Sequence, residues 1–332
     1  MARHTFTREQ IDRYFDRICL APSQRIYNVV ELADSDKVTF LNLLQKHQLC
    51  KMPWENLSMH YSWHRVINVR PAYLFKKMVY SAGVGGYCME ANYLFHLILH
   101  SLGFDVFMAG SRIFRTNTNS YGGWTHVVNL VTIAGVKYLL DGGMGPNGPN
   151  YPMPLHDGKV VTQIAPAQMR LDYEGIAQNL DKSQKVWVYK HRYDETAEMV
   201  PVYCFPDFEF LPADIESMNF EPMLNPKAVF ARKVMAVRFT TDRETDDSSD
   251  GPGSPSQEAL EGEIDGSLSL NHDVLKWRRH GKKFLELTLD TEAARLRALK
   301  RYFGITLQDE DVEAIHGTRA QVGPDTELSG PP

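Results

Sequence analysis

Cys88 carries the strongest chemical signal in this sequence. It follows Gly85-Gly86 and falls in the first turn of a predicted helix. Unpaired backbone N–H groups and the positive end of the helix dipole favour a thiolate there, and the glycines let a substrate approach closely. A small buried core cysteine is the alternative interpretation, because most free cysteines are buried. The other three cysteines have apolar neighbours and are interpreted as structural: Cys19, Cys50 and Cys204.

His126 and Asp141 are the predicted partners of this thiol. A cysteine nucleophile uses a histidine base, and the histidine needs an orienting group. If Ala134-Gly135 is a two-residue hairpin turn, counting outward pairs Val128 with Asp141. His126 then lies on the same face as Asp141, diagonally across the strands and about 7–8 Å away by backbone positions. A slip of one residue would put the two side chains on opposite faces.

Simpler interpretations of the same two residues stay open. The chain has 12 histidines, and a histidine on a strand is commonly a partly buried structural residue. An aspartate before Gly142-Gly143 is typical of turn chemistry. A structural metal is disfavoured, because a cysteine, a histidine and an aspartate lack a fourth nearby ligand. Together with Cys88, the pattern predicts acyl transfer from a thioester, amide or ester.

The segment after Asp141 is rich in glycine and proline. From Gly142 to Gly148 it can offer backbone N–H groups to a phosphate, although no G-K-[ST] sequence follows it. An ordinary surface loop is the alternative interpretation.

Helices are predicted for about the first 105 residues and strands after about residue 106. Helix starts are predicted at Thr7 with Gln10, at Ser35 and Asp36, and at Pro71. The helix that carries Cys88 is expected to end before Gly103. A last helix is predicted from about Thr291 to Phe303, ending at Gly304. The predicted strands are 126–133, 136–140, 185–189 and 234–239.

Composition narrows the class of protein. The 332 residues are 43% hydrophobic and 23% charged, which is enough to build a core and excludes wholesale disorder. A net charge of −5 disfavours nucleic acid as a partner. No apolar run approaches a membrane span, and the first residues lack the apolar region of a secretion signal. A cytoplasmic protein with reduced thiols is therefore expected.

Two segments are predicted to lie outside the core. The stretch 242–266 has nine acidic residues and one basic residue, with Gly, Pro and Ser between them, and is predicted to be a solvated loop. The stretch after Gly317 lacks a periodic apolar pattern and is predicted to fray, with a flexible tail from 321 to 332.

Several segments together resemble the arylamine N-acetyltransferases, over roughly residues 14–317, and fungal members in particular. The segments are Met52-Pro-Trp-Glu-Asn-Leu57, Gly85-Gly-Tyr-Cys88-Met-Glu-Ala-Asn92, Gly123-Trp-Thr-His126, Tyr138-Leu-Leu-Asp141-Gly-Gly-Met-Gly145, Asp214-Ile-Glu-Ser-Met-Asn219 and Leu299-Lys-Arg-Tyr-Phe-Gly304. The sequence departs from the family pattern at Val84, where arginine is usual, at Met144, where phenylalanine is common, and at Gly122, where several relatives have a hydroxyl residue.

The resemblance implies an α+β fold in three parts with a core like that of cysteine proteases. A helical bundle with the nucleophile would span 1–105, and a β-barrel with the histidine and aspartate would span 106–230. An α/β lid would span 231–320 and contain the acidic loop.

The resemblance also implies ping-pong transfer of an acyl group from acyl-coenzyme A to an arylamine, arylhydrazine or arylhydroxylamine. Cys88 would carry the acyl group, His126 would activate Cys88, and Asp141 would orient His126. The resemblance further implies that coenzyme A binds at Gly123, Gly143 and Gly145. It also implies that the substrate pocket is lined by Ile113 and Met144. No metal, tightly bound cofactor, nucleic acid or membrane partner is expected, and the chain is expected to be a monomer or a weak dimer.

The sequence leaves the donor and two other functions open. Acetyl- and malonyl-coenzyme A are both candidate donors, and Arg112 is a candidate partner of a malonyl carboxylate, with a structural ion pair as its alternative role. A cysteine hydrolase or transglutaminase-like enzyme would share the same three catalytic residues. The third alternative is a binding protein that retains the fold without catalysis.

Overall fold

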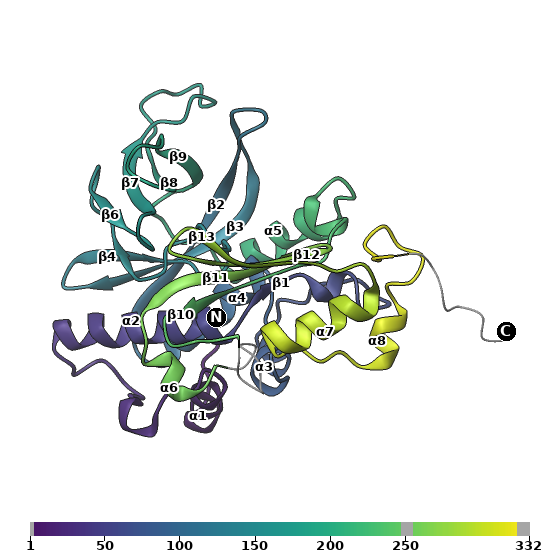
Figure 1. Cartoon of the computed structure of the whole chain (residues 1–332). Helices are drawn as coiled ribbons and strands as arrows, with labels where there is room; N and C mark the ends of the chain where they lie inside the picture. The colour runs from purple at the N-terminus through teal and green to yellow at the C-terminus, as the bar shows by residue number, and fades with distance from the viewer. Residues whose placement is uncertain (1–2, 247–254, 324–332) are drawn as a thin grey trace, which may run out of the picture.

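The computed structural model describes residues 3–246 and 255–323. It has a mixed α/β architecture with two sheets. Figure 1 shows an eight-stranded sheet that curls at the upper left, a five-stranded sheet that crosses the middle, and the helices from the amino-terminal part below them. Within the described ranges, no helix combines the length and the apolar character that crossing a membrane requires.

The amino-terminal third is helical, as predicted. Thr7 caps its first helix through a capping box with Gln10, and Pro71 is the first residue of its third helix. Gly103 follows the fourth helix with φ +88°, a left-handed conformation that suits glycine at a helix end. The helices are α1 (Arg8–Arg17), α2 (Asp34–Lys51), α3 (Pro71–Tyr80) and α4 (Cys88–Ser101).

The predicted start of α2 is wrong by one to two residues. The helix begins at Asp34, so Ser35 and Asp36 lie in its first turn instead of capping it. Ala33 precedes the helix and provides no side-chain cap. Asp34 and Asp36 act instead through their charge, which interacts favourably with the positive end of the helix dipole.

The eight-stranded sheet contains the predicted hairpin. Ile133 pairs with Val136 across Ala134 and Gly135, which both have positive φ, as a type I′ turn requires. The strand order is β5-β4-β3-β2-β9-β8-β7-β6. The strands are β2 (Asp105–Arg115), β3 (Ser120–Ile133), β4 (Val136–Leu140), β5 (Met153–Pro154), β6 (Val160–Thr162), β7 (Gln168–Glu174), β8 (Val186–Arg192) and β9 (Val200–Phe205).

The five-stranded sheet joins the two ends of the chain. Its order is β1-β10-β11-β12-β13, and Trp54 of the short β1 pairs with Val237 of β10. Trp54 also forms a bridge with Gly86, two residues before Cys88, so this sheet continues to the nucleophile's helix. The strands are β1 (Trp54–Glu55), β10 (Met235–Thr241), β11 (Ile264–Asn271), β12 (Val274–Arg279) and β13 (Lys282–Thr288).

The remaining helices flank these sheets. The predicted last helix is observed as α7, with Thr291 as its cap and Gly304 at its end. Its Leu299 and Phe303 belong to a core cluster with Trp277 of β12. The other elements are α5 (Pro212–Leu224), α6 (Gln257–Leu260), α7 (Glu292–Phe303), α8 (Asp309–Glu313), and the 3₁₀ turns η1 (Pro22–Gln24), η2 (Leu57–Met59) and η3 (Val229–Ala231).

The acidic stretch 242–266 is not simply a solvated loop. Glu244 is 3% exposed and forms an ion pair of 2.8 Å with Arg238, and Asp265 is buried beside Arg279. The stretch also contains α6 and the start of β11. The prediction failed because composition reports average charge, whereas individual carboxylates find buried partners in the tertiary structure. Residues 247–254 lie outside the described residues.

The carboxyl-terminal segment is also more ordered than predicted. Ala320 and Val322 are buried at 2% and 6% exposure. Arg295 of α7 donates to the Ala320 carbonyl, and the Val322 N–H donates to Glu292. These contacts hold the chain to α7 up to residue 323. Residues 324–332 of the predicted tail lie outside the described residues.

We predict that Glu244→Ala destabilises the protein by about 3–5 kcal/mol, because Arg238 would lose its buried charge partner. The exposed Glu258→Ala in the same acidic stretch is the matched control. Urea unfolding of both variants measures the difference. Equal stabilities would show that the buried carboxylate does not hold this segment.

Candidate active site

Cys88 lies where the first turn of α4 meets the five-stranded sheet. The Gly86 bridge with Trp54 fixes the entry of the chain, and the Glu90 carboxylate accepts from the Tyr87 N–H at 3.2 Å. The Cys88 side chain is buried, with the residue 4% exposed, and its Sγ lies 3.7 Å from the Thr125 carbonyl oxygen of β3. The predicted placement of Cys88 in the first turn of a helix is therefore observed.

His126 and Asp141 meet as the hairpin register predicts. The observed pairs run from Ile133–Val136 to Asn129–Leu140, so His126 and Asp141 share a face. The side chains close the remaining distance, and His126 Nε2 lies 2.7 Å from Asp141 Oδ2. The Cys88 thiol also interacts with this imidazole and contributes to the raised pKa of His126.

The electrostatics of this group favour a charged imidazole. Burial alone would lower the pKa of His126, but the Asp141 carboxylate and the contact with Cys88 outweigh it and raise the pKa to about 10. Burial alone would raise the pKa of Asp141, but His126 and the hydrogen bonds from Asn92 and the Gly143 N–H lower it below its ordinary value. The pair is therefore arranged as imidazolium and carboxylate at neutral pH.

Asn92 is a site residue to which the sequence reasoning gave no role. Its Nδ2 donates to Asp141 Oδ1 at 2.9 Å and to the Val127 carbonyl at 2.7 Å, and its Oδ1 accepts from the Gly142 N–H. The available signal was its spacing, because a residue four positions after Cys88 lies on the same helix face. Asn92 thus ties the nucleophile's helix to the aspartate.

The three predicted coenzyme A glycines occupy different places. Gly143 packs against the nucleophile, where an added Cβ would lie 2.7 Å from the Cys88 Cα. Gly145 has φ +84°, and an added Cβ would touch only Val237 of β10. Gly123 is exposed on β3, with no atom within 4 Å of an added Cβ. Gly143 therefore packs against Cys88, whereas Gly123 and Gly145 do not.

Ile113 and Met144 both pack against the apolar interior of the eight-stranded sheet. Ile113 pairs with Tyr203 of β9, whose ring centroid lies 5.3 Å from that of His126. Ser111 pairs directly with His126 across the strands and is fully buried. Both predicted pocket residues therefore share one apolar wall with the ring that covers His126.

Arg112 makes structural contacts. Its Nη1 donates to the Gly122 carbonyl at 3.1 Å, and its guanidinium lies 3.8 Å above the ring of Trp124. Among the described residues, no carboxylate forms an ion pair with it, so the structural role is a cation–π contact instead of the ion pair considered from the sequence.

A buried charge cluster beneath the nucleophile was not found from the sequence. Lys77 of α3 lies 2.9 Å from Glu90 and 3.4 Å from Glu55, and both carboxylates are fully buried. Burial raises the pKa of Glu90. Lys77 lowers this pKa and Glu55 raises it further, so that the pKa of Glu90 is about 6. Glu90 also holds the Tyr87 N–H, so the lysine supports the turn that presents Cys88.

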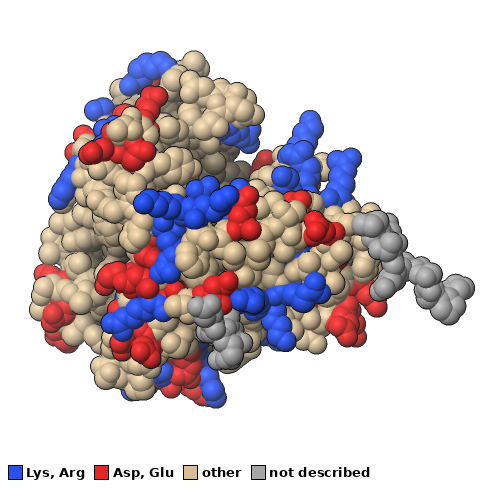
Figure 2. Space-filling model, in the orientation of Figure 1, with Lys and Arg blue, Asp and Glu red and all other residues tan. Residues whose placement is uncertain are grey.

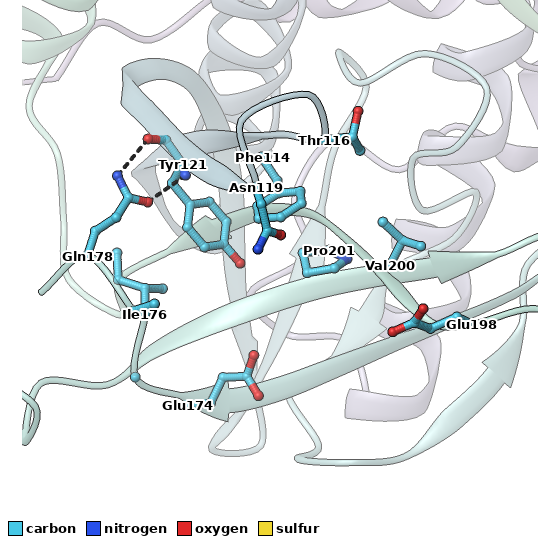
Figure 3. Close-up of a pocket in the computed structure, with 12 residues that line it drawn as sticks. Phe114, Thr116, Asn119, Tyr121, Glu174, Ile176, Gln178, Glu198, Val200 and Pro201 are labelled. Atoms are coloured by element: carbon cyan, nitrogen blue, oxygen red, sulfur yellow. Dashed lines mark hydrogen bonds between the residues drawn. The ribbon is translucent and has the colours of Figure 1, made fainter.

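Two further cysteines and the cavity of Figure 3 are set apart from this group. Burial raises the pKa of Cys50 and Cys204 to about 12, so both stay protonated at neutral pH. The cavity of about 480 Å³ in Figure 3 is lined by Phe114, Tyr121 and Gln178 among others, and by none of Cys88, His126 and Asp141. Tyr121 and Gln178 close one side through reciprocal hydrogen bonds.

Sequence comparisons find relatives along most of this chain. A family profile described as N-acetyltransferase matches residues 37–245. The chain is 31% identical over 335 residues to the N-malonyltransferase FDB2 of Fusarium pseudograminearum, covering 93% of this chain and 92% of that protein. It is 27% identical to the arylamine N-acetyltransferase 2 of Rattus norvegicus, covering 93% and 98%.

Solved structures share the fold. The arylamine N-acetyltransferase of Salmonella typhimurium superposes with a TM-score of 0.73 at 21% identity, covering 94% of this chain and 98% of that one. The Mycobacterium marinum arylamine N-acetyltransferase in complex with CoA gives a TM-score of 0.69 at 22% identity, covering 92% and 98%.

Lys77→Met is expected to lower the free energy of unfolding by about 3–5 kcal/mol, because two buried carboxylates would lose their cation. Lys76→Met changes an exposed neighbour on the same helix and should have little effect. Chemical unfolding of the two variants gives the comparison. A loss of the same size in both would refute the role of the buried cluster.

Gly143→Ala should slow alkylation of Cys88 by iodoacetamide at pH 6 by roughly 100-fold, because the new methyl group would displace the thiol from His126. Gly123→Ala is the control, since its methyl group meets open space. Mass spectrometry of the alkylated protein follows both rates. Similar rates in the two variants would contradict the close contact at Gly143.

Proposed function

Because this chain belongs to the arylamine N-acetyltransferase family, we propose that it transfers an acyl group from acyl-coenzyme A to the nitrogen of an arylamine, arylhydrazine or arylhydroxylamine. The observation that carries the proposal is the buried group in which Cys88 interacts with His126 and His126 Nε2 lies 2.7 Å from Asp141 Oδ2. This group supports a cysteine nucleophile that the imidazole activates.

In the first half-reaction, the Cys88 thiolate attacks the thioester carbonyl of the donor. The new C–S bond forms to Cys88 and the bond to coenzyme A breaks, and His126 gives its proton to the departing thiolate. In the second half-reaction, the amine nitrogen attacks the acyl carbonyl, the C–S bond to Cys88 breaks and releases the Cys88 thiolate, and His126 takes the proton that the nitrogen loses. Asp141 keeps the imidazole oriented and stabilises its charge in both steps.

We assign each predicted binding residue a role that fits its position in the structure. Gly143 keeps space free beside Cys88, so we assign it to the path of the acyl group, with Gly123 and Gly145 along the donor. We assign Ile113 and Met144 to the pocket for the aromatic amine, because both belong to the apolar wall that includes Tyr203. Coenzyme A acts as a co-substrate that leaves after the first step.

The acyl group is proposed to be acetyl or malonyl. The similarity to an N-malonyltransferase favours testing malonyl-coenzyme A first. Arg112 is a weaker partner for a malonyl carboxylate than the sequence suggests, since its guanidinium already contacts Trp124 and the Gly122 carbonyl.

Intact-protein mass spectrometry tests the function. Wild type and Cys88→Ser are incubated separately with acetyl-, malonyl- and propionyl-coenzyme A, and 2-aminophenol is then added. We expect one acyl adduct on wild type only, which the amine discharges as an N-acyl product. An adduct that water discharges equally fast would favour the cysteine hydrolase, and no adduct with any donor would refute the proposal.

The raised pKa of His126 predicts the pH dependence of the thiol's reactivity. A histidine with a pKa near 10 stays protonated from acidic to neutral pH and loses its proton only as the pH approaches 10. The positive charge of this imidazolium favours a neighbouring thiolate, so we expect Cys88 to react with iodoacetamide at pH 6 faster than a model thiol of pKa about 8.5.

His126→Ala should remove this excess reactivity at pH 6, and Asp141→Asn should reduce it strongly. Alkylation rates between pH 5 and 10 measure the effect, with Cys88→Ser as the blank. A wild-type profile that matches a model thiol would contradict the ion pair.

A further inference from the structure

The cavity of Figure 3 lies on the face of the eight-stranded sheet that points away from the catalytic group. Tyr121 and Ile176 line the cavity, and both pack with Cys204 of β9. The preceding residue of β9 is Tyr203, whose ring centroid lies 5.3 Å from that of His126. Successive side chains of a strand point to opposite faces of a sheet, so the cavity and the His126 ring lie on different sides. A ligand in this cavity therefore leaves the catalytic group free.

Two glutamates give the cavity a negative character. Glu174 ends β7 and Glu198 lies just before β9, and among the described residues that line the cavity none is a lysine, an arginine or a histidine. Lys190 lies 2.8 Å from Glu174 and balances its charge, whereas no cation in the described part of the chain forms an ion pair with Glu198. Figure 2 shows acidic side chains gathered over the part of the molecule that β7, β8 and β9 form, with basic side chains around them. The cavity therefore favours a positively charged ligand, and Glu198 supplies the unbalanced charge.

The other walls of the cavity suit a ligand with an apolar body. The rings of Phe114 and Tyr121 meet edge to face, with 5.1 Å between their centroids, and Ile176 and Pro201 add aliphatic surface. In Figure 3 both rings face the space that the two glutamates also border. An aromatic ring attracts a cation over its face, so these walls accept a charged group as well as an apolar one. The volume of about 480 Å³ is that of a small-molecule site, for which the range is roughly 300–1,000 Å³.

Hydrogen bonds hold one wall of the cavity in place before any ligand binds. Gln178 Oε1 accepts from the Tyr121 N–H at 2.6 Å, and Gln178 Nε2 donates to the Tyr121 carbonyl at 3.0 Å. The segment 175–178 is thereby fixed to β3. Burial raises the pKa of Tyr121, so its hydroxyl stays neutral and offers an oxygen to a hydrogen-bond donor. A ligand that binds against this wall does not have to order it.

We propose that the cavity binds a protonated amine with an apolar body, whose ammonium group interacts with Glu198 and Glu174 and whose body packs on Phe114. An ammonium group has three N–H donors, enough for both carboxylates and the Tyr121 hydroxyl. The inference goes beyond the proposed function, because a protonated nitrogen has no free electron pair with which to attack an acyl-cysteine. The phosphates of the acyl donor are anionic, so the same glutamates disfavour that ligand.

Calorimetry on the full chain at pH 7 tests the inference with 2-phenylethylamine, which is protonated, and with 2-phenylethanol, its neutral analogue. Glu198→Gln removes the unbalanced carboxylate, and Phe114→Leu removes the ring but keeps an apolar side chain. Glu9→Gln on α1 is the control for loss of an exposed carboxylate. Cys88→Ser reports any binding at the nucleophile, and thermal unfolding checks that each variant is folded.

The amine should bind wild type, Glu9→Gln and Cys88→Ser with the same Kd. Glu198→Gln should raise that Kd by roughly tenfold, the size of one lost charge-assisted hydrogen bond. Phe114→Leu should raise it by about threefold, the size of a cation–π contact at an exposed site. The alcohol should bind wild type more weakly than the amine, again by roughly tenfold, because it carries no charge.

Equal binding of the alcohol and the amine would overturn the inference, and so would an unchanged Kd in the folded Glu198→Gln variant. Loss of binding in Cys88→Ser would also overturn it, because the amine would then bind at the nucleophile. Displacement of the amine by calcium chloride but not by sodium chloride would assign the carboxylates to a metal ion instead. None of these measurements uses an acyl donor, so a failure of acyl transfer and a failure of this inference are observed separately.

Discussion

The hydrogen bond between His126 and Asp141 is the contact on which the site depends. Both residues are 1% exposed, so each charge needs a partner in place of water. Asp141 obtains further donors from Asn92 and the Gly143 N–H, and His126 faces Cys88 on its other side. Removing any member would leave a buried polar group without its partner.

The nucleophile's helix is held to this pair from several directions. Asn92 joins α4 to Asp141 and β3, while Gly143 packs against the Cys88 backbone without a side chain between them. On the opposite side, Glu90 fixes the helix start and shares Lys77 with Glu55 of β1. The position of the thiol is therefore set jointly by both sheets and by α3.

The nucleophile lies in an environment of low dielectric. The thiol and its imidazole are buried, which strengthens the interaction between them. Phe230 packs on Tyr87, the residue before Cys88, with 6.4 Å between the ring centroids. The segment that presents the thiol is therefore held by aromatic packing as well as by the Glu90 carboxylate.

Local sequence signals determined the elements and the central pair. The type I′ turn at Ala134-Gly135 fixes the register that brings His126 and Asp141 together, because a short hairpin depends on neighbours in the chain. Contacts between distant segments were decided only by the tertiary structure. Lys77 meets Glu55 across different elements, and Glu244 is buried beside Arg238 despite its acidic neighbours. Composition and periodicity carry no record of such pairings, because they arise when sheets and helices pack.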